Sequence, residues 1–165
     1  MENIKNIISK HNSNLIKGAQ PAPPPCECED VCPVKGECEQ SGIVYQASLH
    51  LPNNKVEKYV GLSERKFKER HKEHIRSFEI RKLKNSTTLS KKIWDLKERR
   101  LPFELTWKIL KKAKPYQSGD AHCQLCLTEI CIILFKPEEA SLNSRTEVFN
   151  KCRHSNKFKL DRSKL

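Results

Sequence analysis

The first half of the chain contains two short apolar runs separated by turn residues. Residues 42–51 read GIVYQASLHL and residues 55–61 read KVEKYVG, with PNN in the gap between them. Both runs are rich in β-branched and aromatic residues, which favour strands, and the short connection favours an antiparallel hairpin. The pattern therefore predicts that two neighbouring strands open the folded part of the chain.

Three later segments have apolar residues at helical spacing. The predicted helices run from a cap at Ser63 to about Phe78, over 89–100 after the turn NSTT, and over 121–136 after a cap at Asp120. Phe67, Ile75 and Phe78 would form the inner face of the first helix. Residues 141–149 predict one or two further helical turns.

The segment FELTWKIL at 103–110 alternates apolar and polar residues, which predicts a third strand after Pro102. Phe103, Leu105, Trp107 and Ile109 would then share one face. Strands and helices in this order predict an α+β fold: a small three-stranded antiparallel sheet flanked by helices, with Cys-rich zinc-binding extensions.

Proline and cysteine content divide the chain into segments. The run QPAPPP ends a tail that lacks a core to join, and the following residues are acidic and Cys-rich. The predicted organisation is a flexible tail over 1–25, a Cys-rich knuckle over 26–40, the main folded domain over 41–150 and a basic tail over 151–165.

Charge points to an acidic partner. The 165 residues include 32 Lys and Arg against 20 Asp and Glu, a formal net charge of +12, and residues 63–114 hold 18 of those bases against 7 acids. Such a one-sided segment favours nucleic acid, and the few aromatic residues favour duplex DNA over a single-strand stacking surface. No apolar run is long enough for a membrane span, and no secretory signal is recognised, so neither a membrane nor an exported protein is expected.

The eight cysteines favour metal ligands over disulfides in a chain without a secretory signal. One group is Cys26, Cys28, Cys32 and Cys38. The other is the pair Cys123 and Cys126, followed by Cys152 and His154. Both spacings suit tetrahedral Zn²⁺, with Cys26 and Cys28 the weaker candidates. Two local sites and one mixed site of Cys32, Cys38, Cys126 and His154 remain as alternatives.

Five side chains are candidates for chemistry near the predicted hairpin. Tyr45 and Tyr59 lie on its two strands, and Arg70 and His74 lie four residues apart on one helix face. Glu129 is a carboxylate beside the apolar run ICIILF and needs a partner or a cation there. Each residue alone also has a purely structural interpretation, as packing or as solvated surface.

Together these residues resemble the motif of the GIY-YIG endonuclease superfamily. The resemblance rests on GIVY at 42–45 and YVG at 59–61, followed in the family's order by Arg70, Glu129 and Asn143. The blocks CECEDVCPVKGEC, FKERHKEHIRSF, TTLSKKIWDLK, CQLCLTEI and LNSRTEVFNKCRH resemble most closely the C-terminal endonuclease domain of Penelope-like retroelements. The resemblance covers roughly residues 26–160. Val44 is inserted in the first half-motif, as in other members of that branch, and the chain holds no reverse-transcriptase domain.

The resemblance implies hydrolysis of DNA phosphodiester bonds to leave a 3′-hydroxyl, as used in target-primed reverse transcription. Glu129 would bind Mg²⁺ or Mn²⁺, and Arg70 would hold the scissile phosphate. Tyr45 would be the general base, with its pKa lowered by nearby cations, and Tyr59 would position the nucleophile or replace Tyr45. His74 would orient the phosphate or carry protons, and Asn143 would support the site. Gly61 would lie at a strand exit where a side chain obstructs the site.

The implied partners are double-stranded DNA and a reverse-transcriptase domain upstream or in trans, with nuclear localisation and with zinc in one or two structural sites. The competing interpretation is a catalytically inactive zinc-dependent DNA-binding module. That interpretation would require the basic segment and the cysteines but not Tyr45, Arg70 or Glu129.

Overall fold

A computed structural model describes residues 26, 28, 32–114, 116 and 122–144. The predicted tails over 1–25 and 151–165 lie outside the described residues, and those two divisions of the chain stay predictions. The elements are, in order, β1 (Ile43–His50), η2 (Pro52–Asn54), β2 (Val56–Ser63), α2 (Phe67–Glu79), η3 (Arg81–Leu83), α3 (Thr88–Glu98), β3 (Glu104–Lys112), α4 (Gln124–Phe135) and η4 (Pro137–Glu139).

The sheet has three strands in the order β2-β1-β3, and β1 pairs antiparallel with both neighbours. The predicted α+β class and the three-stranded antiparallel sheet are confirmed. The central strand is nearly continuously buried from Ile43 to Leu49 because helices cover both of its faces. Within this ladder Tyr45 lies directly opposite Gly61.

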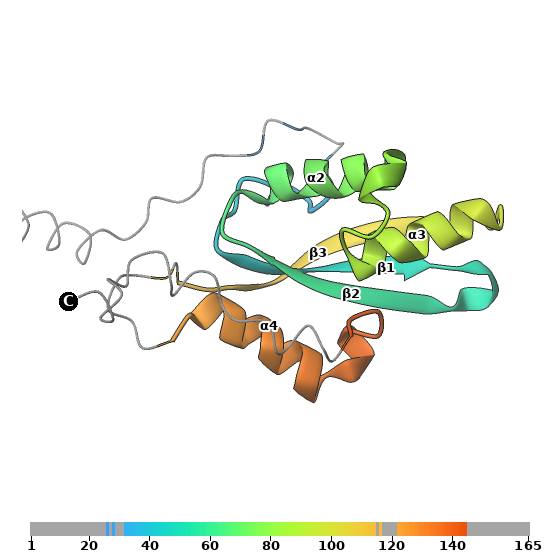
Figure 1. Ribbon diagram of the computed structural model, residues 1–165. Coiled ribbons are helices and arrows are strands. Elements are labelled where there is room, and N and C mark those ends of the chain that lie inside the picture. The colour runs from blue at the N-terminus through green and yellow to red at the C-terminus, as the bar shows by residue number, and fades with distance from the viewer. Residues whose placement is uncertain (1–25, 27, 29–31, 115, 117–121, 145–165) are drawn as a thin grey trace, which may run out of the picture.

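Helices α2 and α3 lie on one face of the sheet and α4 lies on the other, so the molecule has three layers (Figure 1). Alternate residues of β1 supply the two cores. Tyr45, Ala47 and Leu49 pack on the α2 and α3 side, whereas Val44 packs on the α4 side. The predicted shared face of Phe103, Leu105, Trp107 and Ile109 is confirmed, because all four pack on the α2 and α3 side.

The start of the first helix differs from the prediction. Ser63 is the last residue of β2, held there by its pairing with Ile43, and its hydroxyl donates to the backbone oxygen of Arg65. Helix α2 begins at Phe67, and Lys66 at its N-cap position makes no side-chain cap. Ile75 is 38% exposed, and His74 is buried instead, so the inner face of α2 is more polar than expected.

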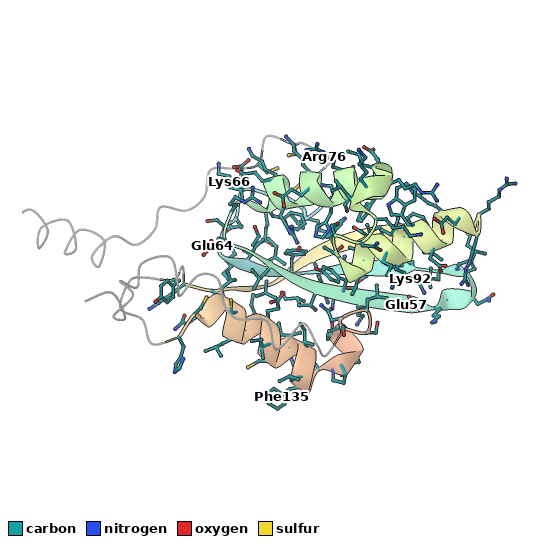
Figure 2. The ribbon with its side chains drawn as sticks, in the orientation of Figure 1. Glu57, Glu64, Lys66, Arg76, Lys92 and Phe135 are labelled. Carbon is teal, nitrogen blue, oxygen red and sulfur yellow. The ribbon has the colours of Figure 1, made fainter. Side chains whose placement is uncertain are left out.

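The second helix follows the prediction closely. Thr87 caps α3 by accepting a hydrogen bond from the backbone N–H of Ser90, and Leu89, Ile93 and Leu96 are buried. The third predicted helix is α4, which begins at Gln124, and its predicted cap Asp120 lies outside the described residues. Helix α4 is apolar on nearly all sides, and Phe135, 78% exposed, points away from the sheet (Figure 2).

Candidate functional site

A buried hydrogen-bonded cluster joins the sheet to α2. The Tyr45 hydroxyl lies 2.7 Å from Nε2 of His74 and 3.0 Å from Nε of Arg70. An arginine N–H can only donate, so the Tyr45 oxygen accepts from Arg70. In the tautomer of neutral His74 with an unprotonated Nε2, the Tyr45 hydroxyl donates its own hydrogen to that nitrogen; in the other tautomer Nε2–H donates to the Tyr45 oxygen. The structure thus brings together three of the predicted site residues in one chain of hydrogen bonds.

Gly61 explains how the Tyr45 ring fits. A Cβ at Gly61 would lie 2.6 Å from the Tyr45 hydroxyl and 2.8 Å from its Cζ, so the phenol occupies the space that any other side chain would need. Gly61 therefore lies inside β2 rather than at a strand exit, and its role is to leave room for Tyr45. Gly42 is required for another reason: its φ is +62°, and a Cβ would lie 2.9 Å from the Ala113 carbonyl.

Burial decides the protonation states in this cluster. It raises the pKa of Tyr45 to about 12, although the positive charge of Arg70 opposes the shift. Arg70 lowers this pKa, as expected of a nearby cation, but desolvation of the phenolate is the larger effect, so the net shift without a metal ion is upward. Burial, assisted by Arg70, lowers the pKa of His74 to about 3, so the imidazole is neutral at physiological pH.

Arg70 connects the buried cluster with the surface. Its Nε donates to Tyr45, and its Nη1 lies 2.9 Å from the Glu73 carboxylate. Burial tends to lower the pKa of Arg70, but its anionic and phenolic neighbours raise it above the ordinary value. The side chain remains 28% exposed, so the guanidinium is within reach of a ligand in solvent.

Tyr59 lies beside the same cluster, whereas Glu129 is placed on the helix that covers the other face of the sheet (Figure 1). The Tyr59 ring is 5.9 Å from the His74 ring, centroid to centroid, on the same face of the sheet as Tyr45. Glu129 is half-buried on α4, and its negative charge raises the pKa of Tyr45, so it lies within electrostatic range of the phenol. The structure therefore brings together Tyr45, Tyr59, Arg70 and His74, and relates Glu129 to them by its charge.

Asn143 acts on the backbone of β2. Its side-chain oxygen accepts from the N–H of Val60 at 2.7 Å, and its amide donates to the Val60 carbonyl at 2.8 Å. Ser141 and Leu142 add hydrogen bonds to Lys58 on the same strand. The chain after η4 thereby covers the edge of the sheet. Asn143 thereby fixes the strand between Tyr59 and Gly61.

Two residues that contact the cluster, Glu73 and Trp107, were not predicted from the sequence. Glu73 pairs with both Arg65 and Arg70, and its spacing of three residues from Arg70 is the signal that would have identified it. Trp107 lies against the rings of Tyr45, His71 and His74, at centroid distances of 6.0, 5.2 and 5.3 Å. Strand alternation had placed Trp107 on the correct face, but only the packing of β3 beside β1 puts it against the cluster.

The N-terminal cysteines form a candidate metal centre. Among the residues that the structure describes, Cys26, Cys32 and Cys38 are the group whose ligand atoms all lie within 4.8 Å of one another. Cys28 joins them, with its Sγ 3.5 Å from that of Cys38. The Gly36 N–H donates to the Cys32 sulfur at 3.1 Å. This group could hold a metal ion, and its sulfur ligands are those that tetrahedral Zn²⁺ takes in structural sites.

The second cysteine group lies elsewhere. Cys123 and Cys126 pack on the α4 side of the sheet, whereas Cys26, Cys28 and Cys32 pack on the α2 and α3 side. The arrangement favours a local N-terminal site over a mixed site that includes Cys126. Cys152 and His154, the other predicted ligands of that second group, lie outside the described residues.

Comparison with known proteins gives no relative: no family model, curated protein or solved structure matches this chain. Within the described residues, no helix combines the length and apolar character that crossing a membrane requires.

Proposed function

We propose that the protein is a metal-dependent DNA endonuclease of the GIY-YIG type, in which the Tyr45, Arg70 and His74 cluster forms the centre of the active site. The observation that carries the proposal is the pair of hydrogen bonds from one buried phenol, to Nε2 of His74 at 2.7 Å and to Nε of Arg70 at 3.0 Å. A buried phenol between a cation and a neutral imidazole is an unusual arrangement for a packing residue, and perturbed titratable clusters are typical of active sites.

Arg70 would bind the scissile phosphate. Its Nε is already engaged by Tyr45, and its partly exposed terminal nitrogens face Glu73. Phosphate would compete with Glu73 for these donors as a charge-assisted bidentate ligand. Glu73 would therefore orient the guanidinium before the substrate arrives.

Tyr45 would take the proton of the attacking water. Its pKa of about 12 keeps the phenol protonated at neutral pH, so Tyr45 would act as a base only if the charge of the bound divalent cation lowered that pKa. His74 would orient the Tyr45 hydroxyl by hydrogen bonding, because an imidazole with a pKa of about 3 does not hold a proton at neutral pH. Tyr59, on the adjacent strand and near His74, would position the water or take over the role of base.

Glu129 would hold the catalytic Mg²⁺ or Mn²⁺. A single carboxylate suits Mg²⁺, which keeps most of its waters and takes its remaining ligands from phosphate. A divalent cation at Glu129 supplies charge that stabilises the leaving oxygen. Neutralising Glu129 also removes one of the influences that raise the pKa of Tyr45.

Duplex DNA is the proposed substrate, in keeping with the basic segment over 63–114. Many of its bases are exposed on α2, η3, α3 and β3, including Lys72, Arg76, Arg81, Lys91 and Lys111. An endonuclease domain of a retroelement, which nicks DNA in the nucleus to prime reverse transcription, is the biological role we propose for this activity. We also propose structural zinc at the N-terminal cysteines.

The experiment is nicking of supercoiled plasmid in Mg²⁺ or Mn²⁺. The wild type should nick, while Arg70→Ala and Glu129→Gln should each lose activity by about 10²- to 10³-fold. Lys55→Ala and Glu138→Gln are the controls because both side chains are exposed and lie outside the basic segment over 63–114, and both variants should retain activity. Equal background in all five proteins, with the protein folded, zinc-loaded and bound to DNA, would instead support the inactive DNA-binding module.

A further inference from the structure

The N-terminal cysteine group contacts the helix that carries Arg70 and His74. Cys38 is completely buried, and it belongs to the same core cluster as Tyr45 and Phe67. Cys26, Cys28 and Cys32 pack against that cluster from outside. A structural change at these sulfurs is therefore transmitted directly to the packing beneath α2.

The beginning of α2 lacks the usual side-chain cap. Lys66, at the N-cap position, has no side-chain oxygen that could accept from the first turn. Backbone carbonyls of the cysteine segment take this role: Gln40 accepts from the N–H of Phe67 at 2.8 Å, and Cys38 accepts from the N–H of Lys68 at 2.9 Å. The last residue of the cysteine group thus caps the helix with its own carbonyl.

The sulfur atoms are spaced for one ion. A tetrahedral Zn²⁺ with sulfur ligands at about 2.3 Å requires sulfurs about 3.8 Å apart. The separations of Cys26 and Cys28 from Cys38 are 2.9 and 3.5 Å, and Cys32 lies within 4.8 Å of both Cys26 and Cys38. Two backbone N–H groups, of Cys28 and Gly36, already donate to sulfur, as outer partners of metal ligands do.

No helix or strand lies within this segment: from Cys32 to Gln40 the described backbone forms turns. The segment is held by the buried side chains of Val34 and Cys38 and by the ion pairs of Glu39 with Lys66 and Lys68. A metal ion that replaces the thiol protons would join the four sulfurs and fix the segment further.

We infer that Cys26, Cys28, Cys32 and Cys38 bind one Zn²⁺ ion, and that this ion positions α2 by fixing the carbonyls of Cys38 and Gln40 on its first turn. Arg70 lies in the turn that these carbonyls cap, and His74 lies one turn further. Metal binding therefore sets the approach of Arg70 to the Tyr45 hydroxyl. The consequence for DNA cleavage rests on the proposed nuclease function, whereas the structural coupling does not.

Hydrogen exchange of the full chain, measured residue by residue by NMR with Zn²⁺ and then after chelation, tests the inference. The amides of Phe67 and Lys68 should lose at least about tenfold of their protection when zinc is removed. The amide of Val60, held by Asn143, and that of Ala113, bonded to Gly42, should change little. Unchanged protection at Phe67 and Lys68, or an equal loss at all four amides, would overturn the inference.

Variants separate the metal from the surrounding charges. Cys28→Ser should weaken binding of Co²⁺, lower its sulfur charge-transfer absorption and reproduce the loss of protection in zinc. Glu39→Gln is the matched control, because it removes the ion pairs of Glu39 with Lys66 and Lys68 but leaves the sulfurs intact. Full protection in Glu39→Gln supports the metal, and a loss equal to that of Cys28→Ser would assign the effect to the ion pairs.

The exchange experiment needs no DNA. A protein without nicking activity but with zinc-dependent protection at Phe67 and Lys68 would retain this inference and reject the nuclease. A protein that nicks DNA but whose amides at Phe67 and Lys68 are equally protected with and without zinc would support the nuclease and overturn this inference.

Discussion

The two faces of the sheet are built from alternating residues of the same strands, yet their buried polar groups do different things. On the α2 and α3 face, Tyr45 bonds to Arg70 and His74, and the cluster reaches solvent through Arg70. On the α4 face, buried Gln46 donates to the backbone and the carboxylate of Glu139. The first arrangement leaves a guanidinium partly exposed beside a buried phenol and imidazole, whereas the second attaches η4 to β1.

The comparison teaches that exposure alone does not distinguish the two arrangements, since the Arg70 side chain is 28% exposed and that of Glu139 is 29% exposed. What differs is the charge that each presents to solvent: a guanidinium in the first arrangement, and a carboxylate paired with Lys58 in the second. Glu139 is bonded to Gln46 and paired with Lys58, which lower its pKa to about 2, so that contact is satisfied within the protein. Arg70 keeps donors partly exposed after bonding to Tyr45. The predictions below test this difference, starting with the largest expected effect.

Substitution of the two adjacent buried residues of β1 should give opposite results. If the protein is the proposed nuclease, Tyr45→Phe should lower the nicking rate by about 10²- to 10⁴-fold because it removes the proposed general base, with the fold retained. Gln46→Leu should leave the nicking rate of folded protein unchanged, while it lowers the free energy of unfolding by about 1–3 kcal/mol, since Glu139 loses its donor. Plasmid nicking and urea unfolding measure both. Equal activity losses in the two variants would remove the distinction between the faces.

His74 should make stability depend on pH. Its pKa is about 3 in the folded protein against about 6.5 in the unfolded chain, so the unfolded chain gains the proton first as pH falls. The stabilisation is complete above pH 6.5 and is lost as pH falls towards 3. It amounts to about 2 kcal/mol lost between pH 7.5 and 5.

The measurement is urea unfolding of the wild type and His74→Gln at both pH values, with metal content matched. The free energy of unfolding of the wild type minus that of His74→Gln should fall between pH 7.5 and 5, because the contributions of all other titrating groups are the same in both proteins and cancel. His50→Gln is the control, since His50 lies at the end of β1 away from the cluster. A wild-type slope that persists in His74→Gln would show that His74 is not the group responsible.

Gly61→Ala should lower the free energy of unfolding by about 1–3 kcal/mol, because the new methyl group would overlap the Tyr45 hydroxyl. In a Tyr45→Leu background the same substitution should cost less, since the shorter side chain does not reach the position of the phenol. A double-mutant cycle by urea unfolding measures the difference. Additive costs would mean that Gly61 is required for something other than Tyr45.

Asn143→Ala should cost about 1–2 kcal/mol, because two hydrogen bonds to the Val60 backbone are lost. Ser141→Ala removes a single acceptor for the Lys58 N–H and should cost about half as much. Thermal or urea unfolding of both variants gives the comparison. A larger cost for Ser141→Ala would contradict the role of Asn143 as the principal contact of this segment with β2.

Local pattern predicted much of the fold. Content of β-branched and aromatic residues identified β1 and β2, and alternation identified β3 and its apolar face. The run NSTT identified the start of α3, because hydroxyl capping, like strand pattern, depends on neighbouring residues. The cap at Ser63 was wrong since pairing with Ile43 extends β2 through that residue. The beginning of α2 could not be predicted because its caps, Cys38 and Gln40, are remote in sequence and act through backbone oxygen, which every residue has.

For the candidate site, the sequence by itself determined which residue types are present, how Arg70 and His74 share a helix face, and why the hairpin brings Tyr45 close to Tyr59 and Gly61. Only the tertiary structure decided that His74 is buried and neutral, that Glu129 lies near Tyr45, and that Cys26 and Cys28 join Cys32 and Cys38. The physical reason is that the spacing of residues in the sequence fixes the directions of their side chains only within one helix or strand. Burial, protonation and ligand grouping depend on what other elements pack around it.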